Sequence, residues 1–391
     1  MKLRALTAGM LTGLTGVAAL VAWLTSSCSP SSFQSVTVVD GVRILASRAS
    51  EPRARPGDTV TVDVLAIDGR LNPTPPMVQY WLPFLCLNPA QDAYYACFAQ
   101  LAGAPAPDGG AILPLATGDG GAPAGGSLGG GAGALAGILK PGVDLSPLLP
   151  TGPSVSFKVP ENAIIDRTGV SPSYGLVILF NIACAGHPEI VASDPNSGNP
   201  QDIPIGCFDA SGNRLGPQDY VIGFTRVYAY TDVTEVNPSI TQVDLGGTLV
   251  GVDGGVTTTV GADGGATIAP FTVPFCTKNT QSDCPHNPIG PVVPQSAPTS
   301  KQVYADFFAT TGTFTSDARL LYDTSVPSLS IPNGTNDNYL APNSLVGLPA
   351  NNAIYIVVHD DQGGADWVTV PLQIDMGADG GADAGDAAAG H

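Results

Sequence analysis

A chain of 391 residues has room for two ordinary domains, each with its own core. Charged residues make up 12% of it, about half the usual share, whereas 48 glycines and 36 prolines indicate that much of the chain forms turns and loops. The formal net charge is −18. Such an excess of acidic groups repels nucleic-acid phosphates and anionic lipid headgroups, so we expect no nucleic-acid partner.

Residues 1–27 have the three-part order of a secretory signal peptide, with Lys2 and Arg4 before an uncharged stretch (5–24) and small polar residues after it. Cys28 follows directly. Its position resembles the acylation site of bacterial lipoproteins, which implies that Cys28 becomes the mature N-terminus and carries acyl chains. Each buried CH₂ contributes about 0.8 kcal/mol, so two or three chains hold a protein on a membrane stably. The expected location is the cell envelope, anchored to the outer membrane and facing the periplasm or the cell surface.

Two alternatives to acylation remain open. Such lipoproteins usually have Leu three residues before the cysteine, whereas this chain has Thr25 there and Leu24 one position further back. The uncharged stretch just reaches the ~20 residues that span a bilayer, so the segment can also be an uncleaved anchor. An ordinary signal peptidase that cuts after Ser27 would instead release the protein. We expect export in each case, with residues 28–35 as a tether.

Apart from Cys28, the chain has six cysteines that form three sequence-local pairs. Other pairings are possible, but in an oxidising compartment the simplest scheme joins neighbours. The expected disulfides are Cys86 with Cys97, Cys184 with Cys207, and Cys276 with Cys284. Closing short loops of this size contributes about 3 kcal/mol each in the chain-entropy model. No pair has the close spacing of a zinc site, so we expect no metal.

Strand signals dominate the first half of the chain, from residue 36 to residue 237. Residues 54–68 contain a Pro-Gly-Asp turn followed by alternation, in which Val60, Val62 and Val64 face one side of a half-buried strand. Pro83 places the strand at 77–86 at an edge or a bulge. The remaining expected strands are 36–46, 154–165, 174–185 and 219–230. Because no sustained helical period appears outside the leader, the sequence predicts an all-β sandwich.

A second set of strand signals begins after a boundary near residues 236–238, so we expect a second sandwich domain at 238–375. Its last two strands flank Asp-Gln-Gly-Gly, which is typical of a hairpin turn. The expected strands are 238–246, 267–276, 301–314, 318–323, 353–360 and 365–374.

Gly-rich tracts interrupt both domains, at 103–150 and 247–266, and residues 376–391 form an Asp/Gly/Ala tail. The first tract has 14 glycines in 48 positions, with few side chains to bury against the entropy of ordering them. We therefore expect these segments to be disordered. The recurring Asp-Gly-Gly triplets could bind calcium through their carboxylates, but they fit neither an EF-hand loop nor the nine-residue β-roll repeat, and a solvated spacer is favoured.

The densest polar cluster is His359 with Asp360, Asp361 and Asp366. Such a set can hold a metal or supply a general base. The same residues also fit a strand, a glycine turn and a second strand. We favour this interpretation because such turns require Asp and Gly.

His187 precedes Pro188 in what we expect to be a loop closed by two cysteines, where a histidine is usually just solvated. The chain lacks H-E-x-x-H and the phosphate-binding glycine motifs. We therefore predict no catalytic residues and no cofactor.

Exposed aromatic residues are the candidates for binding a sugar or a peptide. They are Tyr80 with Trp81, Tyr94 with Tyr95, Phe307 with Phe308, and Trp367. Adjacent residues of a strand send one ring to each face, so we expect one ring of each pair to fill the sandwich core. Trp81, five residues before Cys86, is expected in the core.

Residues 42–68 and 354–374 resemble the first strands and the final hairpin of immunoglobulin-like domains. Together with the leader and the Asp-Gly tracts, they make the chain similar to uncharacterised lipoproteins of Gram-negative bacteria that carry such sandwiches. The resemblance implies two immunoglobulin-like β-sandwich domains and an envelope location, although the chain lacks the cysteine pair that joins the two sheets of antibody domains. We expect a non-catalytic binding or structural module with a protein or glycan ligand. The alternative is a secreted hydrolase with a loop-built site around His187 or His359.

Overall fold

The computed structural model shows an almost entirely β protein. It describes residues 36–101, 111–115, 142–167, 169–191, 203–232, 235–252, 259–260, 266–267, 270–294, 302–325, 335–344, 346, 348–349 and 351–376. The expected signal peptide, Cys28 and the tether lie outside the described residues, as does the tail after Met376. Within those ranges, no helix combines the length and the apolar composition needed to cross a membrane.

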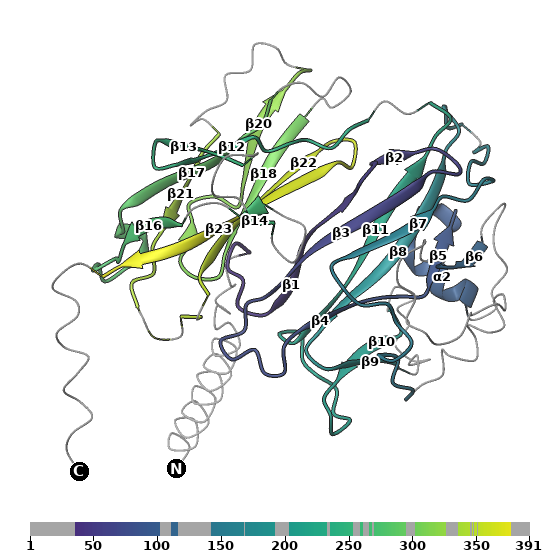
Figure 1. Ribbon diagram of the computed structural model, residues 1–391, viewed down its shortest axis with the longest axis horizontal. Coiled ribbons are helices and arrows are strands. Elements are labelled where there is room, and N and C mark those ends of the chain that lie inside the picture. The colour runs from purple at the N-terminus through teal and green to yellow at the C-terminus, as the bar shows by residue number, and fades with distance from the viewer. Residues whose placement is uncertain are drawn as a thin grey trace, which may run out of the picture. The chain divides into compact units, whose positions relative to one another are not determined.

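The first half of the chain forms a sandwich of two sheets (Figure 1). The smaller sheet has the order β1 (Val42–Ala49), β3 (Thr59–Asp68) and β7 (Ser154–Lys158). The larger sheet has the order β2 (Arg53–Ala54), β11 (Tyr220–Ala229), β8 (Gly175–Cys184), β5 (Phe84–Leu87) and β6 (Ala111–Pro114), and β4 (Val78–Trp81) also pairs with β8. A turn η1 (Ala90–Asp92), a short helix α2 (Tyr94–Leu101) and a hairpin of β9 (His187–Ile190) and β10 (Ile205–Phe208) complete this half.

Alternation of side chains builds the core between these two sheets. Val60, Val62 and Val64 of β3 are buried in one cluster, as the sequence predicts, opposite residues such as Val177 and Leu179 of β8. Burying apolar area in this way contributes about 25 cal/mol per Å². The alternating valines are therefore what fixes the register of β3.

A bulge in β1 lets this strand serve two cores. The pairing with β3 slips between Ile44 and Ala46, so that Val42 and Ala49, an odd number of positions apart, both reach the core of the first sandwich. Ala46 points to the opposite face, into a second apolar cluster. A regular strand would put Val42 and Ala49 on opposite faces.

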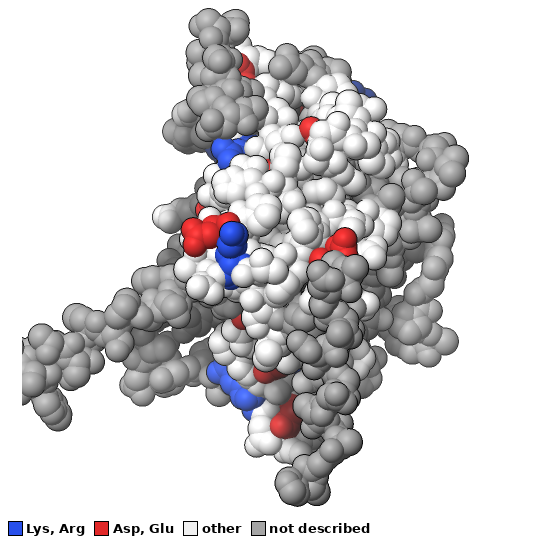
Figure 2. Space-filling view, turned by 90° about the vertical axis from the view of Figure 1, so that its left-hand side faces the viewer, with Lys and Arg blue, Asp and Glu red and all other residues white. Residues whose placement is uncertain are grey.

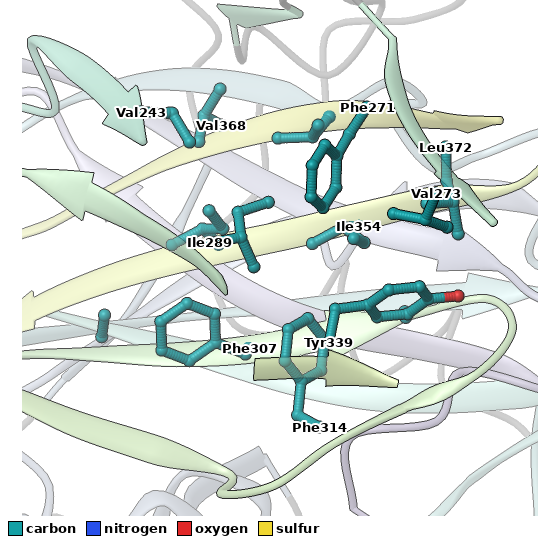
Figure 3. Close-up of a cluster of buried hydrophobic side chains, with 14 of the residues drawn as sticks. Val243, Phe271, Val273, Ile289, Phe307, Phe314, Tyr339, Ile354, Val368 and Leu372 are labelled. Atoms are coloured by element: carbon teal, nitrogen blue, oxygen red, sulfur yellow. The ribbon is translucent and has the colours of Figure 1, made fainter. Parts of the chain in front are cut away.

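The second half forms another two-sheet sandwich, whose core is shown in Figure 3. One sheet has the order β13 (Thr248–Gly251), β12 (Gln242–Leu245), β17 (His286–Val292), β21 (Asp337–Leu340) and β19 (Thr313–Phe314). The other has the order β14 (Thr259–Val260), β15 (Ala266–Thr267), β23 (Ala365–Asp375), β22 (Ala353–Asp360), β18 (Gln302–Ala309) and β20 (Ala318–Asp323), and β16 (Phe271–Pro274) pairs with β23. A short turn η2 (Gln281–Asp283) precedes β17. Rings of Phe307, Phe314 and Tyr339 fill the space between the sheets.

The outer face of the β22–β23 hairpin packs on the outer face of the β1–β3 pair. Trp367 and Tyr355 from the hairpin share one apolar cluster with Ala46 and Leu65. The segment before β1 also bonds to the second half, because the Val39 N–H donates to the Ala309 carbonyl at 2.8 Å. Residues 36 to 391 accordingly group as one compact unit.

Arg48 carries the charge contacts of this junction. Its guanidinium lies 3.2 Å from Asp63 of β3 and 2.7 Å from Asp366 of β23, and it stacks over the Trp367 ring at 4.5 Å. Burial raises the pKa of Asp366, and the Ile240 N–H and Arg48 counteract this only in part. Arg48 therefore favours the charged form of this carboxylate.

All three expected disulfides are present, which confirms the sequence-local pairing. Their Cα–Cα distances are 5.7 Å for Cys86–Cys97, 6.0 Å for Cys184–Cys207 and 5.4 Å for Cys276–Cys284. The first ties α2 to β5, the second ties β8 to β10, and the third closes the turn before β17. The first bridge therefore joins a helix to a strand, the second joins two strands, and the third closes the connection between β16 and β17.

Some local expectations were wrong. Tyr94 and Tyr95 lie on α2 and not on a strand. Two parts of the tract at 103–150 are ordered: β6 pairs with β5, and Leu145 and Leu149 are buried, because short apolar runs there find partners. In the second tract, β13 pairs with β12. The strand expected at 77–86 is broken into β4 and β5 around Pro83.

Replacing Arg48 by Met leaves Asp366 charged and partly buried without its partner. The side chains of the pair keep 22% and 17% exposure. We therefore expect a loss in unfolding free energy of about 3 kcal/mol at pH 7, at the lower end for a broken buried pair. The loss should shrink towards pH 4, because protonation of Asp366 removes the uncompensated charge. Urea unfolding at both pH values measures this.

The matched control is Arg55→Met. Arg55 is an exposed arginine on the same segment, so the substitution removes the same charge at a solvated position. Equal destabilisation by Arg48→Met and Arg55→Met would show that the junction does not rest on Arg48.

Candidate functional site

A cleft of about 600 Å³ opens along the edge of β11, within the size range of ligand pockets. We call it the β11 cleft. One wall carries the rings of Tyr174, Phe224, Tyr228 and Tyr230 with the side chains of Arg53 and Arg226. The turn at 361–363 and the residues Ser47, Ala49 and Thr225 complete its lining. Residues from both halves of the chain therefore form the cleft.

Alternation along β11 explains the composition of this wall. Val227 and Ala229 lie in the core between the sheets of the first sandwich, so their neighbours Phe224, Arg226 and Tyr228 point to the other face. Side chains on one face of a strand repeat about every 6.7 Å. The strand thus presents a row of two rings with a guanidinium between them.

Three tyrosines support one another at the C-terminal end of β11. The Tyr174 ring lies 5.7 Å from Tyr228 and 6.0 Å from Tyr230, between ring centres. The Tyr174 hydroxyl donates to Asp92, and Arg167 both stacks on the Tyr174 ring at 4.4 Å and pairs with Asp92 at 2.8 Å. Burial, followed by the bond to Asp92, raises the pKa of Tyr174 to about 12. These contacts fix the ring that anchors the group.

Helix α2 holds the ring of Phe224, which lies nearer the middle of β11. The Tyr94 ring of α2 stacks on Phe224 with 4.5 Å between centres. Cys97 on the same helix is bonded to Cys86 of β5, which keeps α2 on the sheet. The first disulfide therefore also positions the rim of the cleft.

The two arginines of the cleft form no ion pair among the described residues, which they share with Arg43, Arg55 and Arg214. By contrast, an aspartate pairs with each of Arg48, Arg70, Arg167 and Arg319. In the cleft, Arg53 stacks on Tyr230 at 5.2 Å and Arg226 on Phe224 at 4.9 Å. A stacked guanidinium keeps its in-plane N–H donors free for a ligand.

Thr225 is a buried polar residue that borders the same cleft. It is only 5% exposed, and its hydroxyl has no hydrogen-bond partner among the described residues. Nearly all buried polar groups in proteins are bonded. Thr225 shares the strand face of Val227 and Ala229, and its hydroxyl oxygen is closed to solvent, so this group is not an accessible donor for a ligand in the cleft.

The polar cluster predicted around His359 is divided among three environments. His359 lies 3.4 Å from Asp306 and stacks on Tyr304. Asp360 accepts the N–H groups of Gln362 and Gly364 at 2.9 and 2.7 Å, which confirms the turn interpretation. Asp366 faces Arg48 instead. No group of three metal-ligating side chains occurs in the part of the chain that the structure describes.

The expectation of a loop around His187 was wrong, since His187 is the first residue of β9 and pairs with Phe208 of β10. Its ring lies 2.8 Å from the Glu189 carboxylate. His187 and His359 belong to different sheets, so the fold does not bring the two histidines into one site.

Most aromatic candidates from the sequence are buried. Trp81, Trp367 and Phe307 are each at most 1% exposed, which confirms Trp81 as a core residue. Tyr94 alone among them contacts a ring of the cleft.

The sequence-based search missed the four rings that line the cleft. A usable signal was present in Phe-Thr-Arg-Val-Tyr-Ala-Tyr (224–230), where bulky side chains and small or β-branched ones alternate. In a chain with few charges, an arginine within that row also stands out.

No protein-family model matches the chain, and no curated protein matches it. Among solved structures, the chain is similar to Salmonella alpha-2-macroglobulin reacted with methylamine, with 11% sequence identity and a TM-score of 0.19. The alignment covers 85% of this chain but 17% of that one. A TM-score this low carries no argument about function, so the site rests on its own geometry.

The Tyr174→Phe variant should lose less stability than the parent chain as the pH rises from 9 to 12. The folded state keeps the Tyr174 proton up to a pKa of about 12, whereas an unfolded tyrosine ionises near 10, so stability falls as pH rises between these values. Without the hydroxyl, that part of the fall disappears. Thermal unfolding between pH 9 and pH 12 checks this; equal slopes for the variant and the parent chain would contradict the raised pKa of Tyr174.

Proposed function

We propose that this chain is a lipid-anchored, non-catalytic binding protein of the cell envelope, and that the β11 cleft holds its ligand. The observation that carries the proposal is the convergence of two guanidiniums and four aromatic rings on one cleft. Here the fold positions the guanidiniums of Arg53 and Arg226 on aromatic rings without pairing them with acidic side chains in the described ranges.

Support for an envelope location comes from the cysteines. All six cysteines after Cys28 are paired, as expected in an oxidising compartment outside the cytosol. The leader and Cys28 then account for the seventh cysteine as an acylation site. A cleft on an anchored protein would hold its ligand close to the membrane.

A hydrolase has less support. Each buried or half-buried histidine has one carboxylate neighbour, Glu189 for His187 and Asp306 for His359, and the two pairs lie on different sheets. A triad needs a nucleophile in contact with such a pair.

The anchor is tested by Cys28→Ser in the bacterium that encodes the protein. We expect the parent chain in the membrane fraction with an acylated N-terminal peptide, and the variant in the soluble fraction without acyl mass. Ser26→Ala is the control, because another small residue before the cysteine leaves processing intact. Membrane retention of Cys28→Ser would sink the lipoprotein proposal.

The cleft is tested by co-sedimentation of the full chain with envelope fragments from the same bacterium. Arg226→Ala removes an exposed cleft side chain without touching a core, and Tyr228→Leu keeps apolar bulk while removing the phenol. Each should release about tenfold more protein into the supernatant. Tyr304→Ala, an exposed ring outside the cleft, is the control.

Equal sedimentation of the parent chain and both cleft variants would contradict a binding role for the cleft. Circular dichroism of each variant confirms that it is folded before the comparison is made.

A further inference from the structure

We propose that the ligand of the β11 cleft is an acidic saccharide, an oligosaccharide that carries carboxylates on its sugar rings. The inference rests on the proposed binding function and names the chemistry that the cleft selects. Four observations lead to it, concerning the arginines, the balance of donors, the rings and the strand edge.

The first observation is the positive charge of the cleft. The chain has a net charge of −18, yet the cleft places Arg53 and Arg226 against a single lining carboxylate, Asp361. The planar fork of a guanidinium matches a carboxylate with two parallel N–H donors. A ligand that accepts these paired N–H donors is therefore an anion.

The arrangement of the two arginines calls for more than one acidic group. Arg53 lies across from Tyr228 in the strand pairing and stacks on Tyr230, whereas Arg226 stacks on Phe224, towards the other end of the row. The two guanidiniums are therefore directed to opposite ends of the cleft. Carboxylates on separate units of one ligand fit this better than a single anion.

The second feature is an excess of donors. Besides the arginines, the lining has the hydroxyls of Tyr228 and Tyr230 and the side-chain amide of Gln362. A ligand rich in oxygen acceptors, such as sugar hydroxyls, ring oxygens and carboxylates, satisfies such a surface.

Aromatic rings supply the apolar contact. Tyr174, Tyr228 and Tyr230 form one group, with 5.7 to 6.5 Å between ring centres. The C–H face of a sugar ring packs on such rings, while its hydroxyls point outward to donors. An aromatic group beside hydrogen-bond donors therefore suits a saccharide.

The edge of β11 beside the tyrosines is not open to a peptide strand. β2 already pairs with Tyr228 and Ala229, and the Tyr230 N–H donates to Ala54 at 2.9 Å. At the other end, the Gln218 carbonyl accepts the Val42 N–H at 2.8 Å. A peptide that adds to a sheet needs a free run of backbone groups. Beside the tyrosines, β2 already occupies these backbone groups, so side chains have to recognise the ligand there.

The net negative charge of the chain favours a short ligand. Beyond the cleft, a long polyanion meets the acidic surface of the chain, whereas screening over about 8 Å lets a short ligand respond to the local arginines. We therefore expect a short acidic oligosaccharide to bind at least as well, per site, as the long polymer.

The experiment is calorimetric titration of the full chain in detergent with tetragalacturonate. The neutral probe is its methyl ester, and the peptide probe is an Asp-rich peptide of equal charge. We expect binding of tetragalacturonate and about tenfold weaker binding of the ester, since the carboxylate bonds to the arginines are lost. Arg53→Gln and Arg226→Gln should each weaken tetragalacturonate about tenfold. Arg226→Lys should recover part of this loss.

Arg55→Gln is the matched control, because Arg55 is exposed two residues from Arg53 and does not line the cleft. It should bind as the parent chain does. Equal affinity for the ester, preference for the peptide, or no binding of tetragalacturonate overturns the acidic-saccharide inference. None of these results touches the proposed function, which the co-sedimentation of the cleft variants decides separately.

Discussion

The contact of Arg48 with Asp63 and Asp366 is the constraint on which the rest of the structure depends. It lies where the outer faces of two sandwiches meet, beside the buried ring of Trp367. Neither carboxylate is well solvated, and Asp366 has a raised pKa because of burial. One guanidinium thus neutralises an acid from each sandwich. The β1 bulge is what turns Arg48 to this face while Val42 and Ala49 stay in the first core.

The β11 cleft follows from this junction. Asp366 and Trp367 are the second and third residues of β23, and the turn at 361–363 just before this strand forms one wall of the cleft. β1 forms another wall with Ser47 and Ala49, on either side of Arg48. The same few residues therefore join the sandwiches and bring the two walls together. Charged side chains make up only 12% of the chain, and few of them appear on the face that Figure 2 presents.

Local patterns made much of the fold predictable. Alternation at Val60–Val62–Val64 predicted β3 and its buried face, and the spacing of the cysteines predicted all three disulfides. The cleft was not predictable in the same way, because Arg53, Phe224 and Asp361 meet only through tertiary packing. β17 was missed as well, since its prolines at 288 and 291 argue against a strand that nevertheless pairs on both sides.

The central claim is that the two sandwiches unfold as one body, and the two buried tryptophans test it directly. In a Trp23→Phe background, Trp367→Phe leaves Trp81 to report on the first core, and Trp81→Phe leaves Trp367 to report on the junction. Urea unfolding is followed by fluorescence and by far-ultraviolet circular dichroism in each variant. We predict one transition in each, with the same midpoint by both probes. Two transitions, or a fluorescence midpoint displaced from that of the circular dichroism, would show that the sandwiches unfold independently.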